Sequence, residues 1–330
     1  MSNGPIDRSR RLRAVVGARI RERRVRPADI AGVRVFTYHG LVDSKRDARL
    51  ERNFHTIDQF RAHLAILRRK RVVPPDQVID AAKGASRLTV AITFDDGYQN
   101  NEIAAELLDA ARLPWALFVS TAEVGGDSTI WTARLALLLL HGRAQRVEAL
   151  GHSWGLADRD QRLACFQQVR GPAKQLAQIE RLALLSDLAA QFDSGEEQRL
   201  LLEFPAFRML GWDEVRSIAG RGAIIGSHGV VHEIHHADQP MAVLERELSE
   251  SRVVLGEQLG VECTALAYPN GDWTDSSARI AEHLGYRVGF TTVDDTVRAD
   301  ADPFALPRLT APGNEVGFTR ALLAGHGGGT

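Results

Sequence analysis

The feature that most constrains this chain is a repeated alternation of short apolar runs with segments of helical periodicity. The apolar runs are rich in β-branched residues, and they occupy Val33–Tyr38, Leu88–Phe94, Leu117–Val119, Ala223–Gly226, Ala265–Tyr268 and Val288–Thr292. Between them, apolar residues recur at the spacing of one helix face. This pattern is typical of a mostly parallel sheet covered by helices, and it predicts an α/β fold.

Helices are expected between these runs, and a longer stretch without strand character interrupts them. A helix that begins at Thr56 is indicated by Thr56 and Gln59, which have the spacing of a capping box. Residues 131–211 are rich in Leu, Ala, Gln and Arg, which predicts a helical insertion. We therefore expect a basic N-terminal helix or arm over 1–32, an α/β domain with its insertion over 33–310, and a C-terminal tail over 311–330.

The charge and cysteine content exclude several classes of protein. The 330 residues include 41 Lys and Arg against 42 Asp and Glu, and the net charge of -1 provides no global basic field for binding nucleic acid. The two cysteines, Cys165 and Cys263, lack metal-type spacing, which excludes a disulfide scaffold and a thiolate zinc site. The sequence shows neither a secretory signal nor an apolar stretch long enough to span a bilayer, so we expect a cytoplasmic protein.

The N-terminal arm is strongly basic. Met1–Asp29 contains nine Arg and three acidic residues, which gives a local net charge of +6. Leu12, Val16 and Ile20 recur at four-residue spacing among these arginines. Such a helix could lie on an anionic membrane surface at the inner face, or it could be solvated and frayed. The sequence leaves both alternatives open, and it does not indicate an oligomeric state.

Polar residues follow three of the predicted strands at the point where each strand ends. Asp95 and Asp96 follow one apolar run, His228 and His232 follow another, and Tyr268 ends a third. The carboxyl ends of parallel strands meet at one edge of a sheet, which is where ligands and catalytic groups collect. We therefore expect these residues to form an active site.

These residue types suit a metal site. His228 and His232 are four residues apart, which on a helical turn places both imidazoles on one face. One carboxylate and two imidazoles form a three-ligand set that leaves an open position for water, as a catalytic zinc site requires. The second carboxylate of the Asp95–Asp96 pair is then free to move a proton. Taken alone, Asp95-Asp96-Gly97 is also typical of a simple turn.

Two motifs together resemble a known family. Thr93-Phe94-Asp95-Asp96-Gly97-Tyr98 is similar to the first motif, and Ser227-His228 with His232 to the second, of the NodB-homology polysaccharide deacetylases, carbohydrate esterase family 4. The resemblance covers roughly residues 33–309, interrupted by the insertion. It implies a distorted (β/α) barrel of about seven strands and hydrolysis of N-acetyl groups on amino sugars. It also implies a divalent metal ion, usually Zn²⁺, with Co²⁺ or Ni²⁺ as alternatives.

The resemblance implies a role for each motif residue. Asp96, His228 and His232 match the metal ligands, and Asp95 matches the catalytic base. Tyr38-His39-Gly40 is similar to the N-terminal motif of the exopolysaccharide and surface-polysaccharide deacetylase subgroup. This similarity implies that His39 is the acid that protonates the leaving amine, which suits the near-neutral pKa of an imidazole.

Other positions depart from the family pattern. Tyr268-Pro269-Asn270-Gly271 is similar to the third motif, but its order of Tyr and Pro leaves the oxyanion donor open. The Arg that orients the base in the family is missing from this motif, and Arg308 is the candidate in its place, with a surface ion pair as the alternative. Tyr98, Tyr268 and Pro269 are further candidates for contact with substrate. The usual C-terminal Leu-x-His motif has no match, because His326 lies in a Gly-rich tail.

We therefore predict a metal-dependent hydrolase that removes N-acetyl groups from an amino sugar in a polysaccharide or glycan precursor, as in exopolysaccharide biosynthesis. Two alternatives stay open. The same fold and metal could serve a non-sugar amide hydrolase of the allantoinase-like type, or the scaffold could bind carbohydrate without catalysis. Acetate release from an N-acetylated sugar distinguishes the three hypotheses.

Overall fold

One parallel sheet organises the fold. The structure is a computed structural model that describes residues 31–324. The strands of the sheet are β1 (Gly32–Tyr38), β4 (Arg71–Val72), β5 (Leu88–Phe94), β6 (Ala116–Val119), β9 (Ile224–Ser227), β10 (Ala265–Ala267), β11 (Val288–Phe290) and β12 (Leu309–Thr310). Seven of them lie in the order β11-β10-β9-β6-β5-β1-β12, with β4 paired to β5, and all their pairings are parallel.

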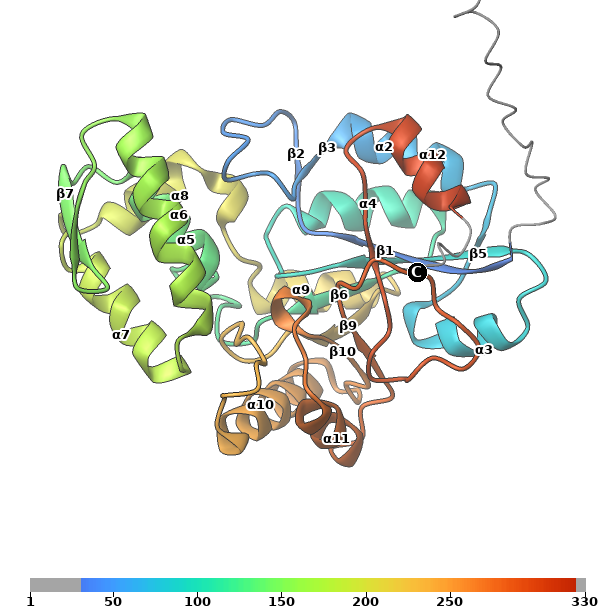
Figure 1. Cartoon of the computed structure of the whole chain (residues 1–330). Helices are drawn as coiled ribbons and strands as arrows, with labels where there is room; N and C mark the ends of the chain where they lie inside the picture. The colour runs from blue at the N-terminus through green and yellow to red at the C-terminus, as the bar shows by residue number, and fades with distance from the viewer. Residues whose placement is uncertain (1–30, 325–330) are drawn as a thin grey trace, which may run out of the picture.

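Helices cover both faces of this sheet (Figure 1). The helices drawn above it are α2 (Ile57–Leu67), α4 (Asn101–Ala111) and α12 (Glu315–Leu323), and those drawn below it are α10 (Met241–Leu259) and α11 (Asp275–His283). Two further helices, α3 (Val78–Lys83) and α9 (Trp212–Gly220), also belong to this part of the chain. Within residues 31–324 the edge strands β11 and β12 are not paired directly, but Leu306, three residues before β12, forms a parallel bridge with Phe290 of β11. The predicted α/β fold with a distorted barrel of about seven strands is confirmed.

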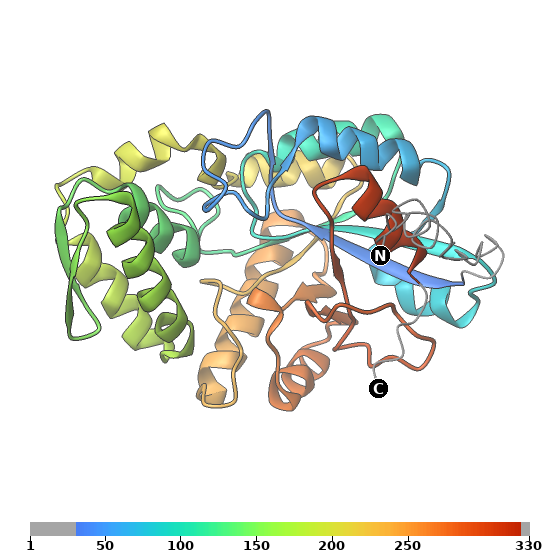
Figure 2. The same cartoon turned by 45° about the horizontal axis from the view of Figure 1, so that its top comes forward.

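A separate lobe is built by residues 131–211 (Figure 2). Its elements are α5 (Trp131–His141), β7 (Arg146–Ala149), β8 (His152–Gly155), α6 (Arg159–Gln175), α7 (Gln178–Ala189) and α8 (Glu196–Glu203). The lobe has its own buried apolar cluster, which includes Leu135, Leu139, Phe166 and Leu185. The sequence predicts only helices here, whereas β7 and β8 form an antiparallel hairpin. This hairpin was missed because β7 is only four residues long and lies among good helix-forming residues.

Most of the predicted strands and helices lie within a few residues of the observed ones. The prediction for Leu88–Phe94 matches β5 in full, because this strand is buried along its length and rich in β-branched residues. The capping box of α2 is present, since Thr56 and Gln59 exchange hydrogen bonds at 2.9 and 3.2 Å. The short strands β2 (Leu41–Val42) and β3 (His55–Thr56) were not predicted.

The prediction for the C-terminal end needs a correction, and most of the predicted N-terminal arm lies outside the described residues. The predicted C-terminal tail is wrong for residues 315–323, because these form α12, whose Phe318 and Leu322 are fully buried. Asn314 caps this helix, and the two apolar residues lie four apart on its inner face. Residues 1–30 of the predicted basic arm, and His326, lie outside the described residues. None of the described helices combines the length and the apolar character needed to cross a bilayer.

Two buried histidines pack around the end of β1. The His63 ring stacks on Phe318 at 3.9 Å between centroids, and its Nδ1 lies 3.1 Å from the hydroxyl of Tyr38. The Nε2 of His55 lies 2.9 Å from the carbonyl oxygen of Ala311. Burial lowers the pKa of both histidines to about 4.

We expect the free energy of unfolding to decrease as the pH falls from about 6.5 to about 4. The unfolded chain takes up protons near pH 6.5, whereas these two imidazoles stay neutral in the folded state until about pH 4. Their contribution is therefore fully present above pH 6.5 and is lost as the pH falls, by roughly 3 kcal/mol per histidine at most. Urea unfolding at pH 7.5, 5.5 and 4.5 measures this loss.

A His63→Phe variant should lose a smaller part of its stability over the same pH range. Phenylalanine preserves the stacking on Phe318 and cannot be protonated. The exposed His283 on α11 provides the control, because His283→Phe should leave the pH dependence unchanged. Equal pH dependence in the wild type and in His63→Phe would contradict the prediction.

Candidate active site

The carboxyl ends of β1, β5 and β9 bring the candidate residues to one cavity. His39 follows β1, Asp95 and Asp96 follow β5, and His228 and His232 follow β9. All five line an open cavity of about 310 Å³. The parallel registers place them side by side, because Tyr38 pairs with Phe94 and the N–H of Asp95 donates to the carbonyl of Tyr38 at 3.0 Å. The edge of the sheet predicted from the strand ends is therefore the place where these residues meet.

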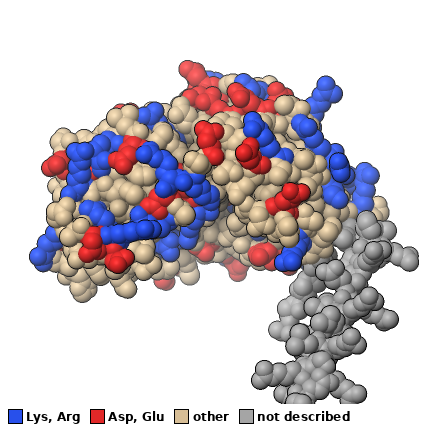
Figure 3. Space-filling view, turned by 90° about the horizontal axis from the view of Figure 1, so that it is seen from above, with Lys and Arg blue, Asp and Glu red and all other residues tan. Residues whose placement is uncertain are grey.

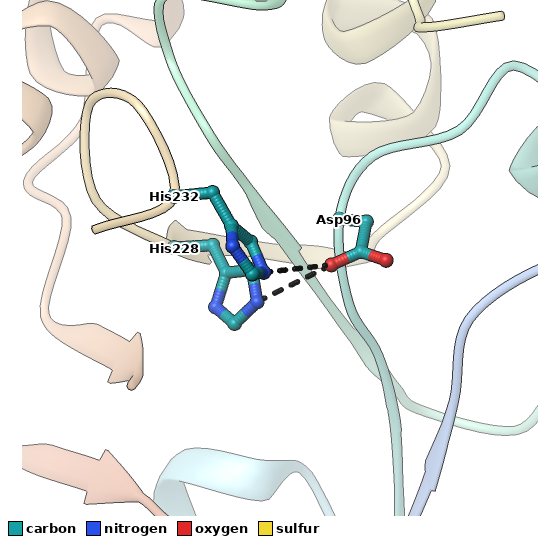
Figure 4. Close-up of side chains that lie close together, drawn as sticks. All are labelled: Asp96, His228 and His232. Carbon is teal, nitrogen blue, oxygen red and sulfur yellow. Dashed lines mark ion pairs between the residues drawn. The ribbon is translucent and has the colours of Figure 1, made fainter. Parts of the chain in front are cut away.

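Asp96, His228 and His232 converge with the geometry of a metal site. The Nε2 atoms of both histidines lie 3.4 Å from Oδ1 of Asp96, and the three potential ligand atoms all lie within 4.8 Å of one another. Figure 4 shows the two imidazoles pointing toward the carboxylate. All three side chains are buried. A buried carboxylate facing two imidazole nitrogens is the donor set that a divalent transition-metal ion requires.

The hydrogen bonds of His228 suit metal binding. Its Nδ1 lies 2.7 Å from the carbonyl oxygen of Ala267, to which a protonated Nδ1 donates. This contact orients the ring and leaves Nε2 free to act as a ligand, as is common for metal-binding histidines. Burial lowers the pKa of His232 more than the nearby Asp96 raises it, which favours the neutral imidazole that binds metal.

The predicted helical turn between the two histidines is wrong. Residues 228–236 form a loop, and the left-handed backbone of Gly229 (φ 78°) and His232 (φ 55°) turns it back toward the cavity. Asp96 also has a left-handed backbone, with φ 77°. The three ligands therefore meet through two turns at strand ends, although the four-residue spacing suggested a helix face.

Arg308 pairs with Asp95 in the interior. Its two terminal nitrogens donate to the two carboxylate oxygens of Asp95, each at 2.7 Å, and its Nε donates to the carbonyl of Thr291 at 2.9 Å. Arg308 is 1% exposed, so this pair is not the surface ion pair that the sequence left open. Burial alone would raise the pKa of Asp95. The charges of Arg308 and His228 lower this pKa by a larger amount, so it lies below the ordinary value for an aspartate.

His39 and Tyr98 lie in the same cavity as the candidate metal ligands. The backbone carbonyl of His39 accepts a hydrogen bond from the side chain of Asn101 at 2.6 Å, which fixes the chain at this point. Tyr98 is buried, and burial together with the neighbouring Asp96 carboxylate raises its pKa well above the ordinary value. The neutral Tyr98 hydroxyl can therefore donate a hydrogen bond to the carboxylate of Asp96.

Tyr268 and Pro269 do not line this cavity, whereas the next residue, Asn270, does. The ring of Tyr268 packs against His235 and Trp273, and its N–H donates to the carbonyl of Phe290 at 2.9 Å. Tyr268 is thus part of the core beneath the site, and the structure does not bring it to the place where substrate would lie.

The lobe supports the loop that carries His228 and His232 through contacts that the sequence analysis missed. The indole nitrogen of Trp131 donates to the carbonyl of His232 at 3.0 Å. Arg181 lies 4.9 Å above the ring of Trp131 and forms a buried ion pair with Glu233. On the other side, Glu247 of α10 accepts hydrogen bonds from the N–H groups of residues 230 and 231. These residues lie far apart in the sequence, so their contacts could not be predicted from it. Only Glu233 offers a signal in the sequence, because it directly follows His232.

We expect Trp131→Phe to weaken Zn²⁺ binding by about tenfold to a hundredfold, the range typical of groups that orient metal ligands. Phenylalanine preserves most of the packing but cannot donate to the carbonyl of His232. Isothermal titration of the metal-free protein with Zn²⁺ measures the effect.

The matched control for this variant is Trp154→Phe. The indole nitrogen of Trp154 also donates to a backbone carbonyl, that of Ala149 at 3.2 Å, but it lies in the β7–β8 hairpin. This control should bind Zn²⁺ like the wild type. If both variants bind Zn²⁺ with equal affinity, Trp131 does not position His232.

Comparison with known proteins gives matches in sequence. A family model described as "Polysaccharide deacetylase" matches residues 82–289, which is more than half of the chain. A Bacillus subtilis (strain 168) protein, YxkH, assigned to the polysaccharide deacetylases, is 26% identical over 102 residues. That match covers 31% of this chain and 36% of YxkH, so it spans only about a third of that relative.

Solved structures give matches in fold. The Streptococcus pyogenes deacetylase PplD in complex with acetate is similar with a TM-score of 0.58 and 16% identity, over 89% of this chain and 98% of that chain. IcaB from Ammonifex degensii is similar with a TM-score of 0.53 and 17% identity, over 89% and 98% of the two chains. At these identities the likeness shows a shared fold.

Proposed function

Because the chain belongs to the polysaccharide deacetylase family, whose members hydrolyse amide C–N bonds, we propose that it removes the N-acetyl group from an amino sugar of a polysaccharide or glycan precursor. One observation carries this proposal. Asp96, His228 and His232 converge on a common point, and the carboxylate of Asp95 lies beside them in the same cavity. This arrangement can activate water at an amide carbonyl.

The residues fit a divalent metal ion, and we propose Zn²⁺. One carboxylate and two imidazoles suit zinc and leave room for water and substrate, while Co²⁺ and Ni²⁺ accept the same donor types. When bound, such an ion acts as a Lewis acid toward the acetyl carbonyl and makes water easier to deprotonate.

In this proposal Asp95 is the general base. It accepts a proton from the attacking water as the new C–O bond forms at the acetyl carbon. Arg308 keeps the carboxylate ionised and aligned through its two hydrogen bonds, so Arg308 acts through Asp95 and not on the substrate.

His39 is the proposed general acid. As the C–N bond breaks, it donates a proton to the leaving nitrogen, and the products are acetate and the free amine. For the oxyanion we propose the backbone N–H of Asn270 as a donor. The N–H of Tyr268 is already used within the sheet, Pro269 has none, and Asn270 is the first residue of this segment that lines the cavity.

Acetate release tests the proposed function. The full chain is stripped with a chelator, reloaded with Zn²⁺, Co²⁺ or Ni²⁺, and incubated with a panel of N-acetylated sugars that includes a neutral chitooligosaccharide. Acetate and the new amine should appear in equal amounts, only with metal. Turnover of cyclic non-sugar amides without acetate release would favour the allantoinase-like alternative, and glycan binding without turnover would favour a binding protein. The cytoplasmic location and the contact of residues 1–32 with a membrane surface stay predictions.

A further inference from the structure

A group of cations lines the outer part of the cavity that holds the metal ligands. Arg52 lies in the loop after β2, while Arg170 and Lys174 lie one turn apart on α6 of the lobe. Figure 3 shows Lys and Arg side chains gathered on the side of the lobe that borders the rest of the molecule. The metal ligands therefore line one part of the cavity, and these three cations line another part.

These three cations form no ion pair within the described part of the chain. In residues 31–324, no carboxylate lies within 4.0 Å of the charged groups of Arg52, Arg170 or Lys174. The contrast is Arg49, which also lines the cavity but is paired with Asp47. The cationic group, defined as Arg52, Arg170 and Lys174, is thus not neutralised by an ion pair within residues 31–324.

The three cations are close enough to repel one another. Burial lowers the pKa of Arg52, and so does the charge of Arg170. Burial, Arg170 and Arg52 all lower the pKa of Lys174, against a smaller opposing effect of Asp272. Like charges held together in a partly buried cavity destabilise the free protein, and a bound anion relieves that repulsion.

Other contacts fix the cationic group in place. The Arg170 guanidinium lies 5.3 Å from the centroid of the Phe166 ring, and the Lys174 ammonium group donates to the side chain of Asn270. Asn270 belongs to the segment that we propose to serve the oxyanion. Lys174 therefore links the cationic group to the reaction site, and one substrate molecule can reach both.

We propose that the substrate is an N-acetylated sugar joined through a diphosphate to its carrier, and that the cationic group binds the diphosphate while the acetyl group faces the metal ligands. This inference rests on the proposed function. Phosphate oxygens accept hydrogen bonds from Arg in a forked geometry, and a lysine is a common partner as a point charge. Two arginines and a lysine match the several negative oxygens of a diphosphate better than the single charge of a uronate carboxylate.

Direct binding tests the proposal without requiring turnover. Isothermal titration of the Zn²⁺-loaded full chain, carrying Asp95→Asn to prevent hydrolysis, compares UDP-N-acetylglucosamine with N-acetylchitotriose, which is neutral. We expect tighter binding of the diphosphate sugar and a loss of about tenfold in its affinity for Arg170→Gln and for Lys174→Gln. The affinity for N-acetylchitotriose should stay unchanged, and the preference should weaken as salt is raised.

The matched control is Arg159→Gln. Arg159 is an exposed arginine at the start of the same helix and does not line the cavity. It should bind both probes like the parent protein, and unfolding curves confirm that all variants are folded. A second arm uses N-acetylglucosamine linked through diphosphate to a short polyprenol, and whichever of the two probes binds more tightly identifies the carrier as nucleotide or lipid.

Several results would overturn the proposal. These are equal binding of UDP-N-acetylglucosamine and N-acetylchitotriose, no effect of Arg170→Gln and Lys174→Gln, or tighter binding of a uronate-containing glycan of the same length. Failure of the proposed function has a different signature, because no acetate would then be released from any substrate while the binding comparison remains measurable.

Discussion

Asp95→Asn is expected to lower the rate of acetate release by about 10²- to 10⁴-fold, the usual contribution of a general base, while Zn²⁺ binding is retained. Asparagine has nearly the same shape as aspartate but cannot accept a proton from water at neutral pH. The proposed metal ligands Asp96, His228 and His232 are untouched by this change. The measurement combines single-turnover acetate release with titration of Zn²⁺ into the variant.

A matched control separates loss of the base from a general effect of removing a carboxylate. Asp58→Asn changes a carboxylate of α2 whose side chain is 91% exposed, and it should leave both rate and metal affinity unchanged. Retained acetate release in Asp95→Asn would assign the proton transfer to another group. Loss of Zn²⁺ binding in that variant would place Asp95 among the metal ligands.

Arg308→Met is expected to destabilise the protein by about 3–5 kcal/mol and to remove most of the activity. The Asp95–Arg308 pair is buried, with side-chain exposures of 4% and 0%, so removing Arg308 leaves a carboxylate without its counter-charge. A buried carboxylate without that partner binds a proton more readily, and a protonated Asp95 cannot act as a base. Urea unfolding and acetate release measure the two effects.

The double variant Asp95→Asn with Arg308→Met tests this interpretation. If the uncompensated charge is the cause, the double variant should be more stable than Arg308→Met alone. Arg298→Met is the matched control, because Arg298 pairs with Asp300 on the surface, at exposures of 61% and 77%. Its effect should stay below about 0.5 kcal/mol. If Arg308→Met were as stable as Arg298→Met, the buried pair would not support the site.

Much of the sheet was predictable, because its strands are nearly continuous apolar runs. The limits of β5 follow from its β-branched residues and from the Asp-Asp-Gly turn after it. The hairpin β7–β8 was not predictable in this way, since its turn at Leu150 and Gly151 depends on left-handed backbone at a leucine. Neighbouring helices also obscured its alternation of buried and exposed residues.

The positions of the residues proposed for catalysis and metal binding were easier to predict than those of the residues that support them. Asp95, Asp96, His228, His232 and His39 all stand at strand ends, and parallel pairing brings such positions together. Arg308 could be named only as a candidate partner of Asp95, because the sequence around Arg308 does not show that a residue after β11 turns inward to meet the end of β5. The partners of the loop that carries His228 and His232 come from the lobe of residues 131–211 and from α10, so only the tertiary structure reveals them.

The left-handed backbone at Asp96 and His232 limits how this centre could be redesigned. Each position must satisfy a conformation that most side chains avoid as well as supply a donor atom. Aspartate and asparagine tolerate that conformation comparatively well, whereas a β-branched residue does not. To make the centre selective for another ion, a new ligand residue would first have to adopt the left-handed backbone of the turn. Only then would its preference for one metal ion over another matter.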